Sequence, residues 1–278
     1  MATYPAAPDP LPRPVIDSHC HLDMGYDGDP MPVDQALAAA AGVGVSGVIQ
    51  VGCDLTGSQW AVEAARDWPN VWAAVALHPN EAPRVHAAGG LTALESELGQ
   101  IAELARRPEV RAVGETGMDF YRTEPSGRAA QEEYFRAHIQ IAKDAGKALV
   151  VHDREAHPDI LRILDDEGAP DRVVMHCFSG DADFAREVTR RGYFCSFAGV
   201  VTFKNASGLR DALLAVPPEL VLVETDAPFL TPVPHRGRPN ASYLLPLTVR
   251  TVAEVRQWPL AETCDRLVAN TESAFGAL

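Results

Sequence analysis

Two histidines, His19 and His21, close an apolar run in the stretch VIDSHCHLD at residues 15–23. Side chains alternate along a β-strand, so both imidazoles point the same way while Cys20 points the opposite way. A lone histidine at a strand end is more often a hydrogen-bonded core residue than a metal ligand. Two buried imidazoles side by side need a further reason, and the binding of one metal ion supplies it.

Other apolar runs of the chain also end in residues that bind metals. These residues are His78, Glu115, His152, His176 and, after the last run, Glu224 and Asp226. In a parallel barrel the carboxyl ends of all strands open on one face, where active sites are built. We therefore expect these residues, although far apart in the sequence, to converge on one face, where Glu115, His152, His176 and Asp226 would join the two histidines of the first run as metal ligands.

The elements that would position them alternate regularly. Eight apolar, β-branched runs are separated by helical patterns: VIDSHCH, GVIQVGC, VWAAVALH, VRAVGETG, ALVVHD, RVVMHCFS, YFCSFAGV and LVLVETD. Near-continuous apolar strands between helices indicate a parallel sheet buried on both faces. Eight such units in 278 residues favour an α/β fold of the TIM (β/α)8 barrel class over an open sheet. Two further helices are predicted over 243–257 and 260–275.

No break in composition marks a linker between domains. We expect a loose, proline-rich lead-in over residues 1–14 and a single catalytic (β/α)8-barrel domain over residues 15–278. The lead-in lacks the apolar core of a signal peptide, and no apolar run is long enough to span a bilayer. The five cysteines are odd in number and form no C-x-x-C pair, which fits unpaired thiols in a reducing cytoplasm.

The charge of the chain limits its partners. A formal net charge of −14 argues against a broad electrostatic grip on nucleic acid, which usually needs a basic surface. Local phosphate contacts through a few arginines remain compatible with this charge. Nothing in the sequence indicates a protein partner or a membrane, and we expect a monomer.

The number of ligands bears on the number of ions. Four histidines and two carboxylates exceed the three or four protein ligands of a single catalytic zinc. They suit two divalent ions bridged by one carboxylate, and Glu115 is the natural bridge. A two-metal site suits in-line displacement at phosphorus.

Several blocks of the sequence resemble the TatD family of metal-dependent deoxyribonucleases, which are amidohydrolase-like TIM barrels. The matching blocks are VIDSHCHLD, ALHP (76–79), AVGETGMDFYR (112–122), HDREA (152–156), HCFSG (176–180), VTFKNASGLR (201–210) and ETDAPFLTPVPHRGRPN (224–240). They occur in the family's order and cover nearly the whole chain after the lead-in.

The resemblance implies a set of roles. The first ion would be held by His19, His21, Glu115 and Asp226, and the second by Glu115, His152 and His176. Asp226 would also orient or deprotonate the attacking water, which with the bridging Glu115 makes these two carboxylates the catalytic residues. The implied activity is that of a 3′→5′ exodeoxyribonuclease on single-stranded DNA ends, supported by Mg²⁺. Imidazole ligands suit Zn²⁺ or Mn²⁺ better.

Four further residues are candidates for substrate contacts: His78, Arg154, Lys204 and Arg236. The alternatives are a structural histidine and ordinary surface ion pairs. The chain departs from the family at Asn80, where members often have a second histidine, and at residues 240–242, where many read Asn-Glu-Pro. Both departures concern substrate contacts rather than the six proposed ligands.

Two other functions remain open. One is a metal-dependent hydrolase of a small-molecule ester or amide, since the fold alone never fixes the substrate. The other is a non-catalytic binding protein. A cluster of phosphate-binding arginines would favour the nuclease, and an apolar closed pocket would favour the small-molecule enzyme.

Overall fold

The computed structural model describes residues 3–278, apart from the side chain at position 91. The strands are β1 (Val15–Cys20), β2 (Val45–Gly52), β3 (Val71–Val75), β4 (Val110–Asp119), β5 (Ala148–Arg154), β6 (Val173–Met175), β7 (Phe194–Phe197) and β8 (Val221–Val223). The helices are α1 (Val33–Gly42), α2 (Leu55–Asp67), α3 (Ala82–Ala105), α4 (Arg128–Ala145), α5 (His157–Glu167), α6 (Ala182–Arg190), α7 (Ser207–Ala215), α8 (Leu245–Arg256) and α9 (Leu260–Phe275).

The order of the strands in the sheet is that of the chain, from β1 to β8. A helix follows each strand, and two helices follow β8. This alternation of parallel strands and helices defines the (β/α)8 class that the sequence predicts. Two compact units make up the chain: residues 3–50 with Gly180–Ala277, and Val51–Ser179 with Leu278. That residues 15–278 form a single domain stays a prediction.

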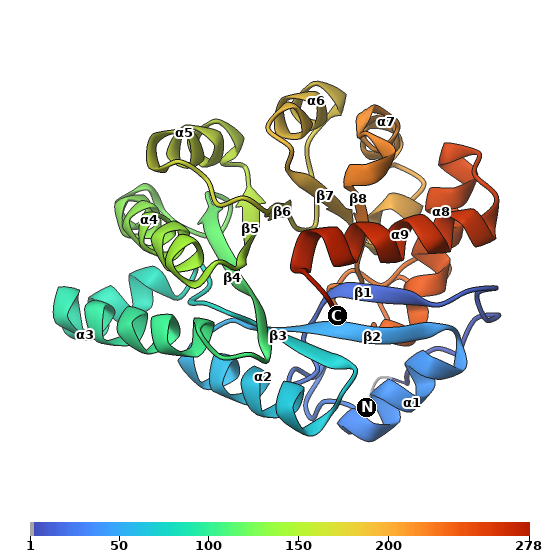
Figure 1. Ribbon diagram of the computed structural model, residues 1–278, viewed down its shortest axis with the longest axis horizontal. Coiled ribbons are helices and arrows are strands. Elements are labelled where there is room, and N and C mark those ends of the chain that lie inside the picture. Colours follow the sequence, from blue (N-terminus) through green and yellow to red (C-terminus); the bar gives the residue numbers. More distant parts are fainter. Residues whose placement is uncertain (1–2) are drawn as a thin grey trace. The chain divides into compact units, whose positions relative to one another are not determined.

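In the first unit, β1 is paired with β2 and β7 with β8, all in parallel. Helix α9 packs against β1 and β8 (Figure 1). Every residue of β1 and β8 is buried, which explains why both strands read as nearly unbroken apolar runs. Beyond β8, a parallel bridge joins Ala227 to Cys20, so the loop after β8 lies beside the end of β1.

Residues 3–14 of the lead-in are held along the first unit rather than loose. The Tyr243 hydroxyl donates a hydrogen bond to the Pro5 carbonyl oxygen at 2.6 Å. The Leu11 N–H donates to the Val43 carbonyl oxygen at 3.0 Å, and Leu11 is buried. These partners come from elements distant in the sequence, which is why local composition alone suggested a loose segment.

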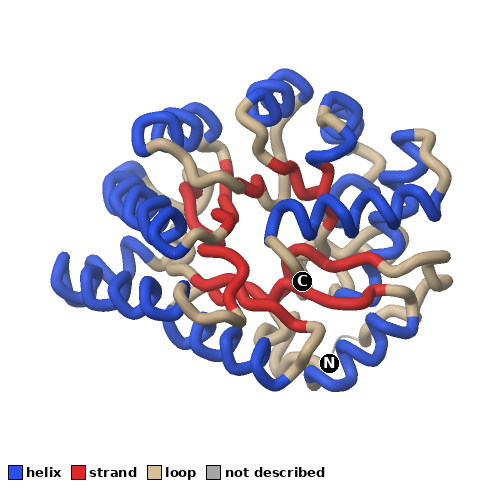
Figure 2. The backbone as a smooth tube through the Cα atoms, in the orientation of Figure 1, coloured by secondary structure: helices blue, strands red, loops and turns tan. Residues whose placement is uncertain are grey.

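In the second unit, β3 to β6 pair in parallel and in order. Figure 2 shows these strands in red as an inner layer, with the blue helices α2 to α5 outside them. Helix α3 begins at Ala82, and Gly90 interrupts its helical backbone at φ 66°. Pro83 stands in the first turn, where proline is well tolerated.

A buried histidine fixes the end of β3. The His138 ring accepts the Leu77 N–H at 3.1 Å through Nε2 and donates to the Tyr134 carbonyl oxygen at 2.8 Å through Nδ1. Burial lowers the pKa of His138 to about 4, so the ring is neutral at physiological pH. This contact anchors the segment immediately before His78.

None of the five cysteines forms a disulfide. Among residues 3–278, no helix has both the length and the apolar character that crossing a bilayer requires.

Two neighbouring leucines of α7 allow a direct test of the core of the first unit. Leu213 is fully buried, whereas Leu214 is 54% exposed. Leu213→Ala should lower the free energy of unfolding by about 2–5 kcal/mol, because it removes buried methyl groups and leaves a cavity. Leu214→Ala should change it by less than about 0.5 kcal/mol. Urea unfolding measures both values, and equal losses would contradict this placement of α7.

Candidate metal centre

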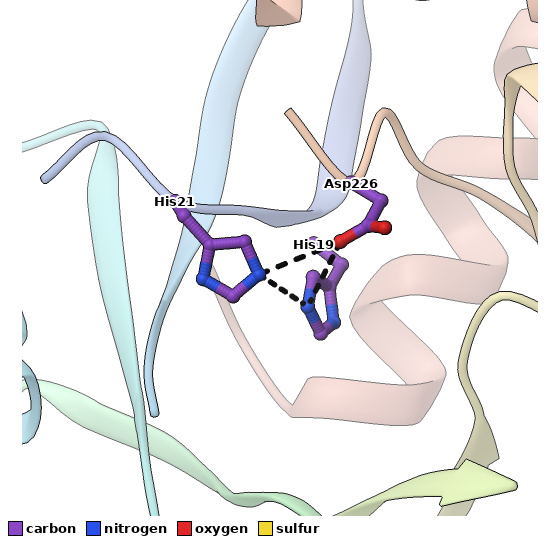
Figure 3. A group of neighbouring side chains, drawn as sticks. All are labelled: His19, His21 and Asp226. Carbon is purple, nitrogen blue, oxygen red and sulfur yellow. Dashed lines mark hydrogen bonds and ion pairs between the residues drawn. The ribbon is translucent and has the colours of Figure 1, made fainter. Parts of the chain in front are cut away.

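Three potential ligands meet in the first unit (Figure 3). His19 lies in β1, His21 directly follows it, and Asp226 lies in the loop after β8. The two imidazole Nε2 atoms are 3.3 Å apart. The Asp226 Oδ1 atom is 3.4 Å from Nε2 of His21 and 3.8 Å from Nε2 of His19. The Cys20 thiol points away, toward the Ile49 carbonyl oxygen, so the prediction that both imidazoles share one side is confirmed.

Backbone and buried polar contacts place Asp226 beside the histidines. Its N–H donates to the His19 carbonyl oxygen at 3.0 Å. The preceding Thr225 donates to the Asp17 carboxylate of β1 through its N–H at 2.9 Å and its hydroxyl at 2.6 Å. Complete burial raises the pKa of Asp17 to about 7, against the lowering effect of these hydrogen bonds.

The loop after β8 is also held from the far side. The buried Asn240 amide donates to the carbonyl oxygens of Thr225 and Phe229, at 2.9 and 2.6 Å. Asp226 itself has a left-handed backbone at φ 52°, which aspartate tolerates better than most residues. The loop is therefore fixed on both sides of the carboxylate.

The distances in this cluster fit a metal ion. Ligands of a tetrahedral ion with bonds of about 2.0–2.1 Å lie about 3.3–3.4 Å apart. Two nitrogens, at least one of them without a proton, and a carboxylate oxygen gather at close to this spacing. Imidazole and carboxylate together suit Zn²⁺ or Mn²⁺. The residues of the first unit therefore fit a divalent cation.

A second cluster surrounds one carboxylate oxygen in the second unit. The Glu115 Oε2 atom is 2.8 Å from His176 Nε2, 3.1 Å from His152 Nδ1 and 3.7 Å from His78 Nε2. Burial by itself would raise the pKa of Glu115. The charges of His176 and His78 and the hydrogen bonds of His152 and His176 outweigh this effect and hold the pKa well below its usual range.

The structure groups His78 with Glu115 and His152 as potential ligands, although the sequence suggested only a substrate contact for His78. The His78 Nδ1 atom accepts the Asn80 N–H at 3.1 Å, which leaves Nε2 facing Glu115. The Cys53 thiol, which the sequence did not single out, donates to Glu115 Oε1 at 3.6 Å.

Asp119 is a further residue that sequence reasoning missed. Its Oδ2 atom is 3.3 Å from Nε2 of His152, on the side of the ring opposite to Glu115. The pairing of Gly117 with His152 between β4 and β5 brings the two carboxylates to the ring. A Cβ at position 117 would lie 2.1 Å from the His152 carbonyl oxygen, so only glycine fits there. The glycine in the block GETGMD was the available signal.

The six predicted ligands thus fall into two groups. His19, His21 and Asp226 meet in the first unit, and Glu115, His152 and His176 meet in the second. That Glu115 also holds the first ion stays a prediction. Glu224, the other carboxylate at the end of the last strand, is fully buried.

The predicted substrate arginines share an unusual environment. The Arg154 guanidinium stacks on the Tyr121 ring at 3.9 Å, and that of Arg236 stacks on the Phe203 ring at 4.0 Å. Neither guanidinium has a hydrogen bond or an ion pair with another residue in the part of the chain that the structure describes. Lys204 is exposed and adjoins Phe203 in the sequence.

A small pocket adjoins His21 within the first unit. Its lining includes Tyr4, Met24, Met31 and Pro228. The room inside it suffices for about one or two water molecules.

Several known proteins are similar to this chain along most of its length. A relative from Mycobacterium tuberculosis, described as an uncharacterized metal-dependent hydrolase TatD, is 40% identical over 266 residues, which cover 94% of this chain and 98% of the relative. YcfH of Escherichia coli, with a similar description, is 39% identical over 242 residues, or 86% of each chain. The crystal structure of YjjV, a TatD homolog from Escherichia coli, is 27% identical and covers 95% of this chain and 98% of that one, with a TM-score of 0.84.

The (β/α)8 order of elements, the clustered ligands and these relatives define the class of the protein, a metal-dependent hydrolase. The model of a family described as TatD related DNase matches residues 16–276. The chain belongs to this family, as its sequence blocks predict.

Metal binding should stabilise the folded protein. Zn²⁺ or Mn²⁺ at a hundredfold excess over its Kd should add about 2.7 kcal/mol of stability. At about 2–4 °C per kcal/mol, the melting temperature should rise by about 5–10 °C, and EDTA should reverse the rise. The effect should shrink below about pH 6, because protonated imidazoles do not bind metals.

Two variants make this measurement specific. His21→Asn should reduce the rise in melting temperature. His157→Asn should keep it, because His157 pairs with Asp153 at 2.7 Å. A full rise in His21→Asn would contradict the proposed ligand role.

Proposed function

We propose that the protein is a phosphodiester hydrolase that acts on DNA, as a 3′→5′ exodeoxyribonuclease at single-stranded ends. The observation that carries the proposal is the pair of imidazole–carboxylate clusters, one around Asp226 and one around Glu115. Membership of a family described as TatD related DNase supports the same substrate class.

Two divalent ions, Mg²⁺, Mn²⁺ or Zn²⁺, would complete the site. His19, His21 and Asp226 would hold one of them, and Glu115, His152 and His176 the other. When bound, such ions supply Lewis-acid stabilisation of charge at phosphorus and activation of water. Glu115 is the proposed bridging ligand.

Asp226 is the residue that we expect to accept a proton from the attacking water. Asp226 is 14% exposed, so it is open enough for water to approach, and its Oδ1 atom faces both histidines. We assign it the orientation of the attacking water and the removal of its proton.

The stacked arginines support a nucleic-acid substrate. An arginine without a carboxylate partner keeps its full charge and its fork of donors for a phosphate. Tyr121 is 62% exposed, so the ring face not covered by Arg154 is available for a nucleobase. In the first unit, Arg236 and Lys204 near Phe203 would act in the same way. His78, in contrast, lies with Glu115 and His152 in a group of potential metal ligands.

The charge of the chain favours trimming of ends over the wrapping of a duplex. At a net charge of −14, capture depends on these few cations rather than on a basic surface. Cysteines that form no disulfides fit a cytoplasmic enzyme, and we expect it to act as a monomer without a protein partner.

The small-molecule alternative would favour an apolar closed pocket. The pocket beside His21 has room only for water, so it does not offer the apolar substrate site that this alternative would favour.

An assay of end-labelled DNA tests the proposed reaction. Single-stranded DNA labelled at its 5′ end should yield a ladder that shortens from the 3′ end and requires a divalent ion. Asp226→Asn should lower turnover by at least about 10²-fold, because it removes a base and a ligand but little volume. Asp183→Asn should keep full activity, because the Asp183 side chain is 92% exposed and pairs only with Arg186 among the described residues.

The same assay on RNA and on a p-nitrophenyl ester separates the alternatives. Cleavage of the ester alone, with metal bound, would move the substrate to small molecules. Full turnover in a folded Asp226→Asn variant would contradict the role of this residue.

The stacked pair in the second unit makes a separate prediction. Arg154→Ala and Tyr121→Ala should each raise KM for an oligonucleotide by about 5- to 160-fold, since one stacked base contributes about 1–3 kcal/mol. Neither should change KM for bis(p-nitrophenyl) phosphate, which lacks a nucleobase, by a comparable factor. Arg84→Ala is the control, because Arg84 is 76% exposed and pairs with Glu81. An unchanged oligonucleotide KM would show that the pair is only surface packing.

A further inference from the structure

The His152 ring lies between two carboxylates of β4. Its Nδ1 atom is 3.1 Å from Glu115 Oε2, and its Nε2 atom is 3.3 Å from Asp119 Oδ2. A neutral imidazole carries one N–H, so one of its two nitrogens must face a carboxylate oxygen without a proton. A cation beside that nitrogen removes the resulting repulsion.

Asp119 is held more rigidly than an ordinary surface carboxylate. Its side chain is 1% exposed, and its Oδ1 atom accepts the backbone N–H groups of Tyr121 and Arg122 at 3.0 and 2.8 Å. Its own N–H donates to the Gln131 amide oxygen at 3.1 Å. Asp119 is therefore a carboxylate held in a fixed position, with its Oδ2 atom facing the His152 ring.

Asn80 completes this support. Its amide nitrogen donates to Asp119 Oδ2 at 3.3 Å, and its amide oxygen accepts the Thr123 hydroxyl at 3.2 Å. Gln131 in turn donates to the Thr123 hydroxyl at 2.7 Å and to the Pro79 carbonyl oxygen at 3.0 Å. In this network of Asp119, Asn80, Thr123 and Gln131, each hydrogen bond has one donor and one acceptor.

We propose that Asp119 is the positioning residue of His152: it accepts the Nε2–H, and the ring therefore presents the unprotonated Nδ1 to the cation that it shares with Glu115. This inference rests on the proposed cation site of the second unit. A carboxylate behind a ligating histidine fixes the tautomer and the orientation of the ring and makes it a stronger ligand. Asp119 itself need not touch substrate or metal.

The amide at position 80 suits this arrangement. It donates to Asp119 with one end and accepts from Thr123 with the other, which a carboxylate or an ammonium group cannot do. Because Asn80 is uncharged, the negative charge of Asp119 remains directed at His152. Asn80, where this chain departs from the common family pattern, thus belongs to the support of Asp119.

Asp119→Asn tests the proposal, because asparagine keeps the acceptor for the backbone N–H groups but loses the charge. Calorimetric titration of the metal-free full-length protein with Zn²⁺ should show one site weakened by about 10- to 100-fold. The same titration in a His21→Asn background identifies that site as the one of the second unit. In the zinc-loaded wild type, ¹H–¹⁵N spectra of the imidazoles should show a slowly exchanging His152 Nε2–H, which the variant should lose.

The matched control is Asp153→Asn. Asp153 belongs to the same strand as His152 and also pairs with a histidine, His157, at 2.7 Å. Its variant loses an equivalent aspartate–histidine pair outside the cluster, so zinc affinity and the His152 signal should stay at wild-type values. Asn80→Ala should weaken the same zinc site by about 2- to 10-fold, as the loss of one supporting hydrogen bond implies.

The outcomes separate this inference from the proposed function. Wild-type zinc affinity and an intact His152 signal in Asp119→Asn would overturn it. If Asp119→Asn fails to fold, unchanged affinity in Asn80→Ala would overturn it as well. Weakened zinc binding in the variant, in a protein that cleaves no DNA, would support the positioning role and refute the nuclease.

Discussion

The structure depends on a set of buried imidazole nitrogens and carboxylate oxygens. These atoms lie so close together that they repel one another unless a cation or a proton lies between them. The Nε2 atoms of His19 and His21, 3.3 Å apart, cannot satisfy each other when both lack a proton. Burying such groups is costly in the absence of a partner. The surrounding fold must therefore hold the ligands in place against this cost, and a divalent ion offsets it when bound.

The residues that hold the ligands in place have no catalytic role of their own. Asp17 and Asn240 fix the loop that bears Asp226, and His138 anchors the chain before His78. The close approach of the Gly117 and His152 backbones places the His152 ring between two carboxylates. The apolar strands stabilise the fold, and these few polar contacts fix the positions of the ligands.

Much of this arrangement is predictable from the sequence, because strand ends in a (β/α)8 fold carry the functional residues and H-x-H places two imidazoles on one side. The places of Asp119 and Asn80 were not predictable, since they follow from the register between β4 and β5 and from contacts with Gln131 of α4. The lead-in was misjudged because its partners, such as Tyr243, are distant in the sequence.

The stacked arginines have a consequence for how the proposed binding of a nucleic acid would respond to salt. Most arginines of the chain are engaged by its own acceptors, as Arg136 is by Glu132, Asp166 and Glu167. Few cations remain to displace counterions from a polyanion. Each phosphate neutralised on a single strand contributes about −0.7 to the slope of log affinity against log salt concentration. Contacts with one or two phosphates would give a slope of only about −0.7 to −1.4. Changes in ionic strength would then barely alter which strands are bound. The choice among nucleic acids would depend on the groups around the metal ligands.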